Sequence, residues 1–377
     1  MVSGGGTLRG SQGSPRCLGA VSGFLLKLIR ESAGLTQIQL AEKLGVDVAS
    51  VQGWESGRRP LTALRAADLA GLRSRLVRYG AQPTLLATLE DAIQADLIIA
   101  QAVQAGGQLI TADEHPLGVT VHQRQLTKLI TWPFTGLAPD SLRDLVSARV
   151  RRGPVPDQPT LTQDERTRFF DHLLVTADAN PHDEAVLCRR QAIYLLSFDT
   201  RAGTADWLRT EQQRTLRAAW RTDHVPSWVA VRESAVGLAR GGDRDPLRAF
   251  LRHALTTDQL EQANLNYWAY WAGEIGDVQV DHKFIVRIKP GDWNGTRLLR
   301  HLLNEPNDLN PSCNHVELRI HAVWALLLTH RSLLSIHPGL RSAVASTVEE
   351  LAEDHDLSLE ARRELSDIGY AVRLAHQ

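Results

Sequence analysis

The chain has 377 residues, of which 43% are hydrophobic and 23% are charged. This is the mix of an ordinary globular protein, and the length exceeds that of one typical domain. A formal net charge of −1 excludes a global attraction to nucleic acid or to a membrane surface, so any site for a polyanion must be local. The three cysteines (Cys17, Cys188 and Cys313) lack the spacing of a zinc site or a disulfide framework, which fits a reducing, cytoplasmic location.

The first residues of the sequence carry no signal for a helix or a strand. Residues 1–20 are rich in glycine and serine and lack the apolar segment of a signal peptide, so we expect a disordered tail. No apolar run approaches the roughly 20 residues that span a bilayer, so we expect no membrane partner.

Residues 21–80 predict a compact helical domain. Thr36 and Gln39 have the spacing of a capping box, which predicts the start of a second helix. Gly45 stands where a left-handed residue ends that helix, and Asp47 is expected to cap a third one. Val51 and Trp54 are the inner residues of the third helix. Two short helices joined by a tight glycine-containing turn form the helix-turn-helix geometry.

The same block resembles the Cro/CI-type helix-turn-helix, also called the xenobiotic-response-element family. The matching positions are Gly34-Leu35-Thr36-Gln37, Leu40-Ala41, Leu44-Gly45-Val46, Ser50-Val51, and Trp54-Glu55 followed by Gly57, Arg59 and Pro60. The resemblance implies that the third helix enters the major groove of double-stranded DNA. The alternative is a helix-turn-helix kept for protein contacts or as a scaffold.

The predicted DNA-binding residues fall into two groups. The resemblance implies backbone contacts for Gln37, Ser56, Arg58 and Arg59. The outer positions of the third helix are Val48, Ala49, Ser50, Gln52 and Gly53, among which Gln52 and Ser50 carry hydrogen-bonding side chains for base edges. Val48 and Ala49 suit a thymine methyl group, and specificity rests partly on DNA shape. Residues 21–80 carry nine Lys/Arg and five Asp/Glu, a local net charge of +4.

The middle of the chain predicts a connection between two domains. Residues 81–150 form a connecting helical segment that contains a helix over Pro83–Val103 and an exposed-type turn at Thr131–Gly136. This turn is expected to brace the DNA-binding block, and the alternative is a domain hinge. Residues 151–160 hold three prolines and a glycine and predict an exposed linker.

Residues 161–377 predict a large α-helical domain for sensing and dimerisation. Short-linked amphipathic helices follow one another there, which is typical of a solenoid-like or irregular array. Val278–Ile288 is the one plausible strand of a chain otherwise expected to be all-α.

One helix of this region concentrates aromatic side chains. Tyr267, Trp268 and Trp271 either pack in the core or line a ligand pocket. The run around them resembles a segment of large helix-turn-helix regulators of actinomycetes. The histidines near Cys313 form no second close pair, so we expect no metal site and no cofactor.

These observations together predict a sequence-specific transcription regulator that binds double-stranded DNA. Its large helical domain is expected to sense a small-molecule or protein effector. We expect a homodimer, because one short recognition helix reads few base pairs. The alternative is an antitoxin-like or phage-defence interaction module that binds DNA only to regulate itself. No catalytic motif is present in the sequence, so we expect no enzymatic activity.

Overall fold

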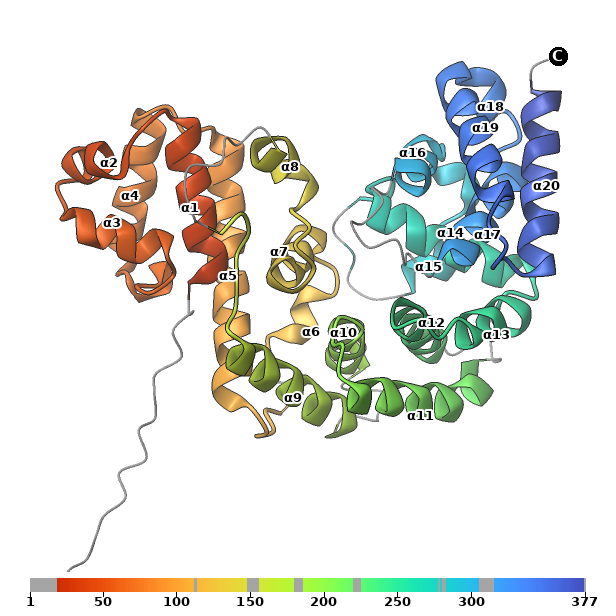
Figure 1. The fold of residues 1–377 in the computed structure, drawn as a ribbon, viewed down its shortest axis with the longest axis horizontal. Helices are drawn as coiled ribbons and strands as arrows, with labels where there is room; N and C mark the ends of the chain where they lie inside the picture. The colour runs from red at the N-terminus through yellow and green to blue at the C-terminus, as the bar shows by residue number, and fades with distance from the viewer. Residues whose placement is uncertain are drawn as a thin grey trace, which may run out of the picture. The chain divides into compact units, whose positions relative to one another are not determined.

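The protein is described by a computed structural model that covers residues 19–111, 114–147, 156–179, 186–219, 225–276, 279, 283–304 and 315–375. Every regular element in these ranges is a helix, which confirms the all-α class (Figure 1). Residues 1–18 of the predicted tail, Cys313 and the first half of the predicted linker lie outside the described residues. The predicted end of the tail at residue 20 is wrong, because Ala20 is buried and begins the first helix.

Contacts between residues divide the chain into two compact units. Unit 1 holds the chain up to Leu109 together with Gln125–His172, and unit 2 holds Ile110–Arg124 together with Leu173–Gln377. Residues 161–172 therefore group with the N-terminal unit by contact, although the sequence places them after the linker.

Unit 1 begins with the predicted helix-turn-helix block. Its elements are α1 (Ala20–Ser32), α2 (Gln37–Leu44), α3 (Val48–Glu55), the 3₁₀ helix η1 (Leu61–Ala63), α4 (Ala66–Arg78) and α5 (Pro83–Ala105). The capping box of α2 is present, because the Thr36 side chain accepts from the backbone of Gln39 and the Gln39 side chain accepts from the backbone of Thr36. Gly45 ends α2 in the left-handed conformation, with φ of 67°.

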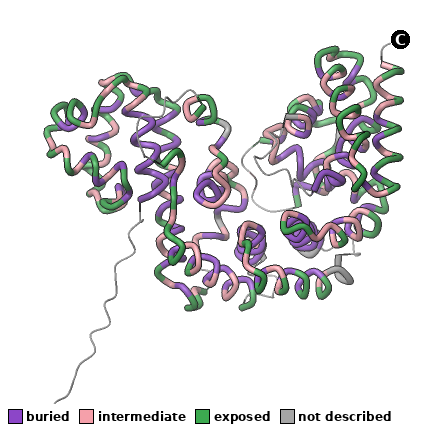
Figure 2. The backbone as a smooth tube through the Cα atoms, viewed as in Figure 1, coloured by how far each residue is buried: buried purple, intermediate pink, exposed green. Residues whose placement is uncertain are grey.

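Helix α1 is the centre of this unit. All its residues from Ala20 to Arg30 are buried, and Figure 2 shows the helix in purple along most of its length. It packs against α3 on one side and α5 on another. A helix that is buried along most of its length packs on several neighbours, so α1 supports α3 from inside the unit.

The later helices of unit 1 are α7 (Arg124–Thr135), α8 (Asp140–Ser147) and α9 (Gln163–Ala179); α7 begins at the last residue of a unit 2 segment and α9 continues into unit 2. The predicted exposed turn at Thr131–Gly136 is wrong, because these residues up to Thr135 are helical and the Trp132 side chain is fully buried. The Trp132 ring meets Phe24 of α1 edge-on, with 5.3 Å between centroids. The segment therefore supports the DNA-binding block from the inside.

Unit 2 is a succession of packed helices. They are α6 (Leu117–Thr120), α10 (Val186–Leu196), α11 (Ala202–Ala219), α12 (Val225–Arg240), α13 (Asp245–Ala254), α14 (Asp258–Ala272), α15 (Phe284–Arg287), the 3₁₀ helix η3 (Pro290–Asp292), α16 (Thr296–Asn304), α17 (Val316–Thr329), α18 (Leu333–Ile336), α19 (Pro338–Ala352) and α20 (Leu359–Leu374). Consecutive helices α11, α12 and α13 pack on one another, as an array requires. One apolar core extends from Trp228 to Ile368.

The predicted strand at Val278–Ile288 is wrong where the structure describes it. Phe284–Arg287 form the single helical turn α15, with Phe284 and Ile285 buried. A short apolar run fits a buried helix or a buried strand equally well, and here α14 supplies the packing partner. Part of the predicted strand lies outside the described residues.

Candidate nucleic-acid interface

The third helix is held against the block by a small apolar contact. Val51 is fully buried, and Leu40 and Ala41 of α2 are buried beneath α3. Trp54, predicted to face inward, is half-buried. Asp47 precedes α3 as predicted, but its side chain makes no capping hydrogen bond; its backbone oxygen accepts from Ser50 instead.

Glycines let the backbones of α1 and α3 approach closely. A Cβ atom at Gly23 of α1 would lie 2.2 Å from the Trp54 backbone oxygen. A Cβ atom at Gly57, which has φ of 70°, would lie 2.8 Å from the Gly19 backbone. Both positions therefore require glycine, and they fix the end of α3 on α1.

A buried ion pair connects α1 to the end of α3. The Arg30 guanidinium donates to the Glu55 carboxylate at 2.5 and 3.1 Å, and both side chains are almost fully buried. Such a two-bond arrangement fixes orientation as well as distance. Glu55 then accepts a third hydrogen bond, from the Gln37 amide at 2.7 Å.

The network continues to the surface of α3. The Gln52 amide donates to Gln37 Oε1 at 3.5 Å, so the predicted backbone-contacting residue and the predicted base-reading residue are neighbours. Gln52 is exposed. The ion pair in the core thereby helps to orient Gln37, and Gln37 in turn lies against Gln52.

Arg59 lies across the outer side of α3. A Cβ atom at Gly53 would be 2.9 Å from Arg59 Cδ and 3.0 Å from Cγ, so the arginine stem covers this glycine. Gly53 is consequently buried, which corrects its predicted place on the outside. The Arg59 guanidinium donates to Ser50 Oγ at 3.1 Å.

The remaining predicted residues form the rim of this surface. Ala49, Ser56 and Arg58 are exposed, and Val48 and Ser50 are half-buried. The Ser56 hydroxyl donates to the Gly53 backbone oxygen at 3.2 Å. The structure thus brings Arg59 onto Ser50 across Gly53, while Gln52 is exposed on another side of α3 beside Gln37.

Asp96 of α5 is a residue that sequence reasoning missed. Its two carboxylate oxygens accept from the backbone N–H groups of Val21 and Ser22, at 2.9 and 2.8 Å. Burial raises the pKa of Asp96 to about 7, although these hydrogen bonds oppose the shift. The carboxylate caps α1 in place of a local N-cap side chain, since Gly19 offers none. No local pattern reveals a cap that comes from so far along the chain.

The aromatic helix α14 lies in the core of unit 2. Tyr267 and Trp268 are buried and Trp271 is half-buried. The Arg190 guanidinium lies 5.6 Å from the Tyr267 ring, and that of Arg232 lies 4.4 Å from it. These rings serve as packing partners for two buried cations, and the ligand pocket proposed for them stays a prediction.

Glu233 is the carboxylate at the centre of this aromatic and cationic cluster. It accepts from Tyr267 Oη at 2.6 Å and from Arg232 at 3.1 Å, and it lies 3.9 Å from Arg190. Burial raises the pKa of Tyr267 above its usual range, so the phenol remains a hydrogen-bond donor.

His321 of the C-terminal region has two carboxylate partners. His321 lies between Glu261 and Glu364, with nitrogen–oxygen distances of 2.8 and 2.7 Å. No group of three or more ligand-type side chains suited to an ion occurs in the described part of the chain.

Comparison with known proteins identifies the type of the N-terminal block. A helix-turn-helix family model matches residues 26–72, which span α2 and α3 and the network described above. This block is a helix-turn-helix DNA-binding domain of the Cro/CI type. No curated protein and no solved structure matches the chain. Among the described helices, none has the length and apolar character needed to cross a membrane.

Proposed function

We propose that the chain is a sequence-specific transcription regulator that reads double-stranded DNA with the outer face of α3. The observation that carries this proposal is the position of Arg59, expected from the resemblance to contact the DNA backbone, whose side chain crosses Gly53 and reaches Ser50. Arginine and glutamine are the side chains that recognise guanine and adenine in the major groove. Arg58, which points from the same loop and is exposed, is suited to a phosphate contact.

The proposed regulator binds as a homodimer. One helix of eight residues reaches few base pairs, and a second copy reads a half-site about 34–36 Å away. Unit 2 is larger than a dimerisation surface requires, so we assign to it the sensing of a small-molecule or protein effector. Coupling of about 1–3 kcal/mol between effector and DNA is the range expected of such a device.

The test begins with selection of preferred sites from a random DNA library by the full-length protein. Dissociation constants are then measured on selected and scrambled duplexes at one salt concentration for wild type and Gln52→Ala. We expect Gln52→Ala to cost about 1–3 kcal/mol on the selected site and little on scrambled DNA. Gln104→Ala, which removes an exposed glutamine from α5, is the matched control. Equal losses on both duplexes would refute base reading by Gln52.

A further inference from the structure

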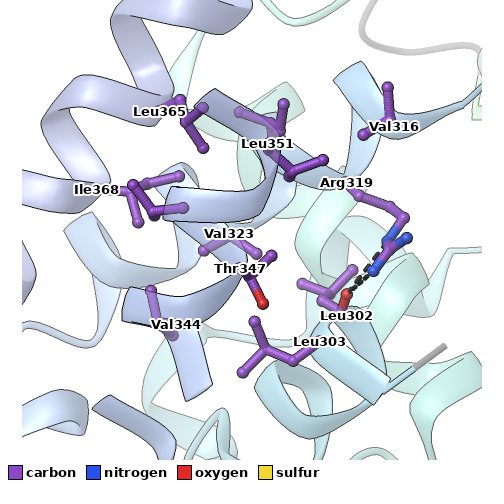
Figure 3. A pocket seen from close by; sticks show the side chains of 12 residues that line it. Leu302, Leu303, Val316, Arg319, Val323, Val344, Thr347, Leu351, Leu365 and Ile368 are labelled. Atoms are coloured by element: carbon purple, nitrogen blue, oxygen red, sulfur yellow. Dashed lines mark hydrogen bonds between the residues drawn. The ribbon is translucent and has the colours of Figure 1, made fainter. Parts of the chain in front are cut away.

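Two cavities of different character lie among the described residues of unit 2. The first lies among the aliphatic side chains of α16, α17, α19 and α20 (Figure 3). Its one charged neighbour, Arg319, donates to the Leu302 backbone oxygen at 3.1 Å. The space amounts to about 20 Å³, enough for roughly one water molecule and for no larger ligand.

The second cavity is an open cleft of about 610 Å³, a volume within the range of small-molecule sites. It is formed just after α14, at the start of α16 and around α18. Its lining mixes apolar and polar side chains and carries two arginines, Arg297 and Arg300, one carboxylate, Glu274, and two histidines, His330 and His337. The excess of cationic over anionic groups favours an anionic ligand.

Glu274 already shows how an oxyanion is bound at one end of this cleft. One oxygen of its carboxylate accepts from the backbone N–H groups of Arg297 and Leu298, at 2.7 and 2.9 Å. These are N–H groups in the first turn of α16, where unpaired donors and the helix dipole favour negative charge. The chain thus supplies its own carboxylate to the position that a ligand oxyanion would occupy.

The two arginines of the cleft differ in their partners, since Arg297 donates to the Gly273 backbone oxygen at 2.9 Å. The Arg300 side chain is exposed and has no partner among the described residues. His330 Nε2 is shielded from solvent and has no hydrogen-bond partner there. The His330 ring is held in place by Trp293, with 4.7 Å between ring centroids. His337 is engaged, since its Nε2 atom lies 3.3 Å from Thr296 Oγ1.

We propose that this cleft binds the phosphate group of a small phosphorylated molecule. Arg300 pairs with the phosphate, and Glu274 competes with the ligand for the N–H groups of α16. Arginine is suited to this role because its planar guanidinium matches two phosphate oxygens. Binding at the cleft stands independently of DNA binding, whereas its use as the effector site rests on the function proposed above.

The experiment is isothermal titration of the full-length protein with inorganic pyrophosphate, without DNA and at constant ionic strength. We expect Arg300→Ala to weaken binding by about tenfold or more, because it removes a charge-assisted pair. Glu274→Gln is expected to tighten binding, because the competing negative charge is gone. Arg363→Ala, which removes an exposed arginine from α20, is expected to leave binding unchanged.

Several outcomes would overturn the proposal. Wild type that binds no pyrophosphate, or Arg300→Ala that binds as wild type does, excludes the site. An equal loss in Arg363→Ala indicates only general attraction to surface charge. Glu274→Gln that is folded by circular dichroism and binds no tighter refutes the competition. A duplex-DNA titration separates the phosphate sources: if Arg300→Ala weakens DNA binding and not pyrophosphate binding, the cleft contacts a nucleic-acid backbone. None of these results tests whether α3 reads DNA, so the two proposals fail independently.

Discussion

Helices α3 and α14 both carry polar side chains, and they use them in opposite ways. On α3, Gln52 is exposed and Ser50 and Arg59 reach one another across the outer face of the helix. On α14, Asn266 is fully buried, donates to two backbone oxygens near α15 and accepts from the Trp293 indole.

The difference lies in where the partners are. Asn266 and Tyr267 of α14 find their partners inside the chain, so they specify how the helices of unit 2 pack. Those on the outer face of α3 retain donors for a partner outside it. The supporting ion pair of Arg30 and Glu55 is buried beneath this face. The predictions below test this division of roles.

The largest effect is expected at the centre of unit 2. Glu233→Ala leaves the buried guanidinium groups of Arg190 and Arg232 without their shared carboxylate, which costs about 3–5 kcal/mol of unfolding free energy. Chemical denaturation followed by tryptophan fluorescence measures the loss. Glu350→Ala, at an exposed position of α19, is the matched control and is expected to change little.

The same variant tests whether the two units have separate roles. At a temperature where Glu233→Ala is still folded, its affinity for the selected DNA site is expected to equal that of wild type. Glu55→Ala, the counterpart in unit 1, is expected to lower both stability and DNA affinity, because Gln37 and Gln52 lose their anchor. Weakened DNA binding in Glu233→Ala would contradict the division.

The second effect concerns pH and is expected in unit 2. Burial lowers the pKa of His321, but the hydrogen bonds and charges of Glu261 and Glu364 outweigh it and raise the pKa to about 9. The folded state therefore holds a proton that the unfolded chain releases near its ordinary value of about 6.5. The stabilisation is fully present below about pH 6.5 and is lost as pH rises through about 9, at most about 3 kcal/mol in all.

Urea denaturation between pH 6 and 10 measures this loss, with His321→Gln as the comparison. The variant cannot take up the proton, so its stability should depend less on pH over that interval. If wild type and variant fall in parallel, His321 does not carry the charge that its two carboxylates favour.

A third, smaller effect is expected on the DNA-reading face. In Gly53→Ala the added Cβ displaces the Arg59 stem, so affinity for the selected site falls by about 1–3 kcal/mol. Stability should change by less than about 1 kcal/mol, because alanine favours the helix and a flexible side chain can move. Gly71→Ala in α4, where an added Cβ meets nothing within 4 Å, is the control. A variant that binds DNA normally would show that Arg59 reads nothing from its position over Gly53.

The sequence predicts the helix-turn-helix well because its signals are local. The capping box of Thr36 and Gln39 and the left-handed Gly45 each act within a few residues, and both are present. The partners of buried charges cannot be predicted in this way. Asp96 caps α1 from 74 and 75 positions away, and Glu233 meets Tyr267 from a different helix. Helical periodicity predicts Gly53 on the outside, because it cannot reveal that a side chain from the next loop folds over it.

The smallest effect separates the two neighbouring arginines after α3. Arg58 is exposed and has no partner among the described residues, so it is free to neutralise a phosphate. Arg58→Ala is expected to weaken binding to selected and scrambled DNA alike and to reduce the slope of log K against log salt by about one. Arg59→Ala is expected to weaken the selected site more than scrambled DNA, because Arg59 lies on the reading face. Salt titrations of both variants on both duplexes distinguish the roles.

Identical behaviour of the two arginines would mean that Arg59 leaves Ser50 on binding and contacts the backbone. The side chains left to read bases would then be Ser50 and Gln52 alone.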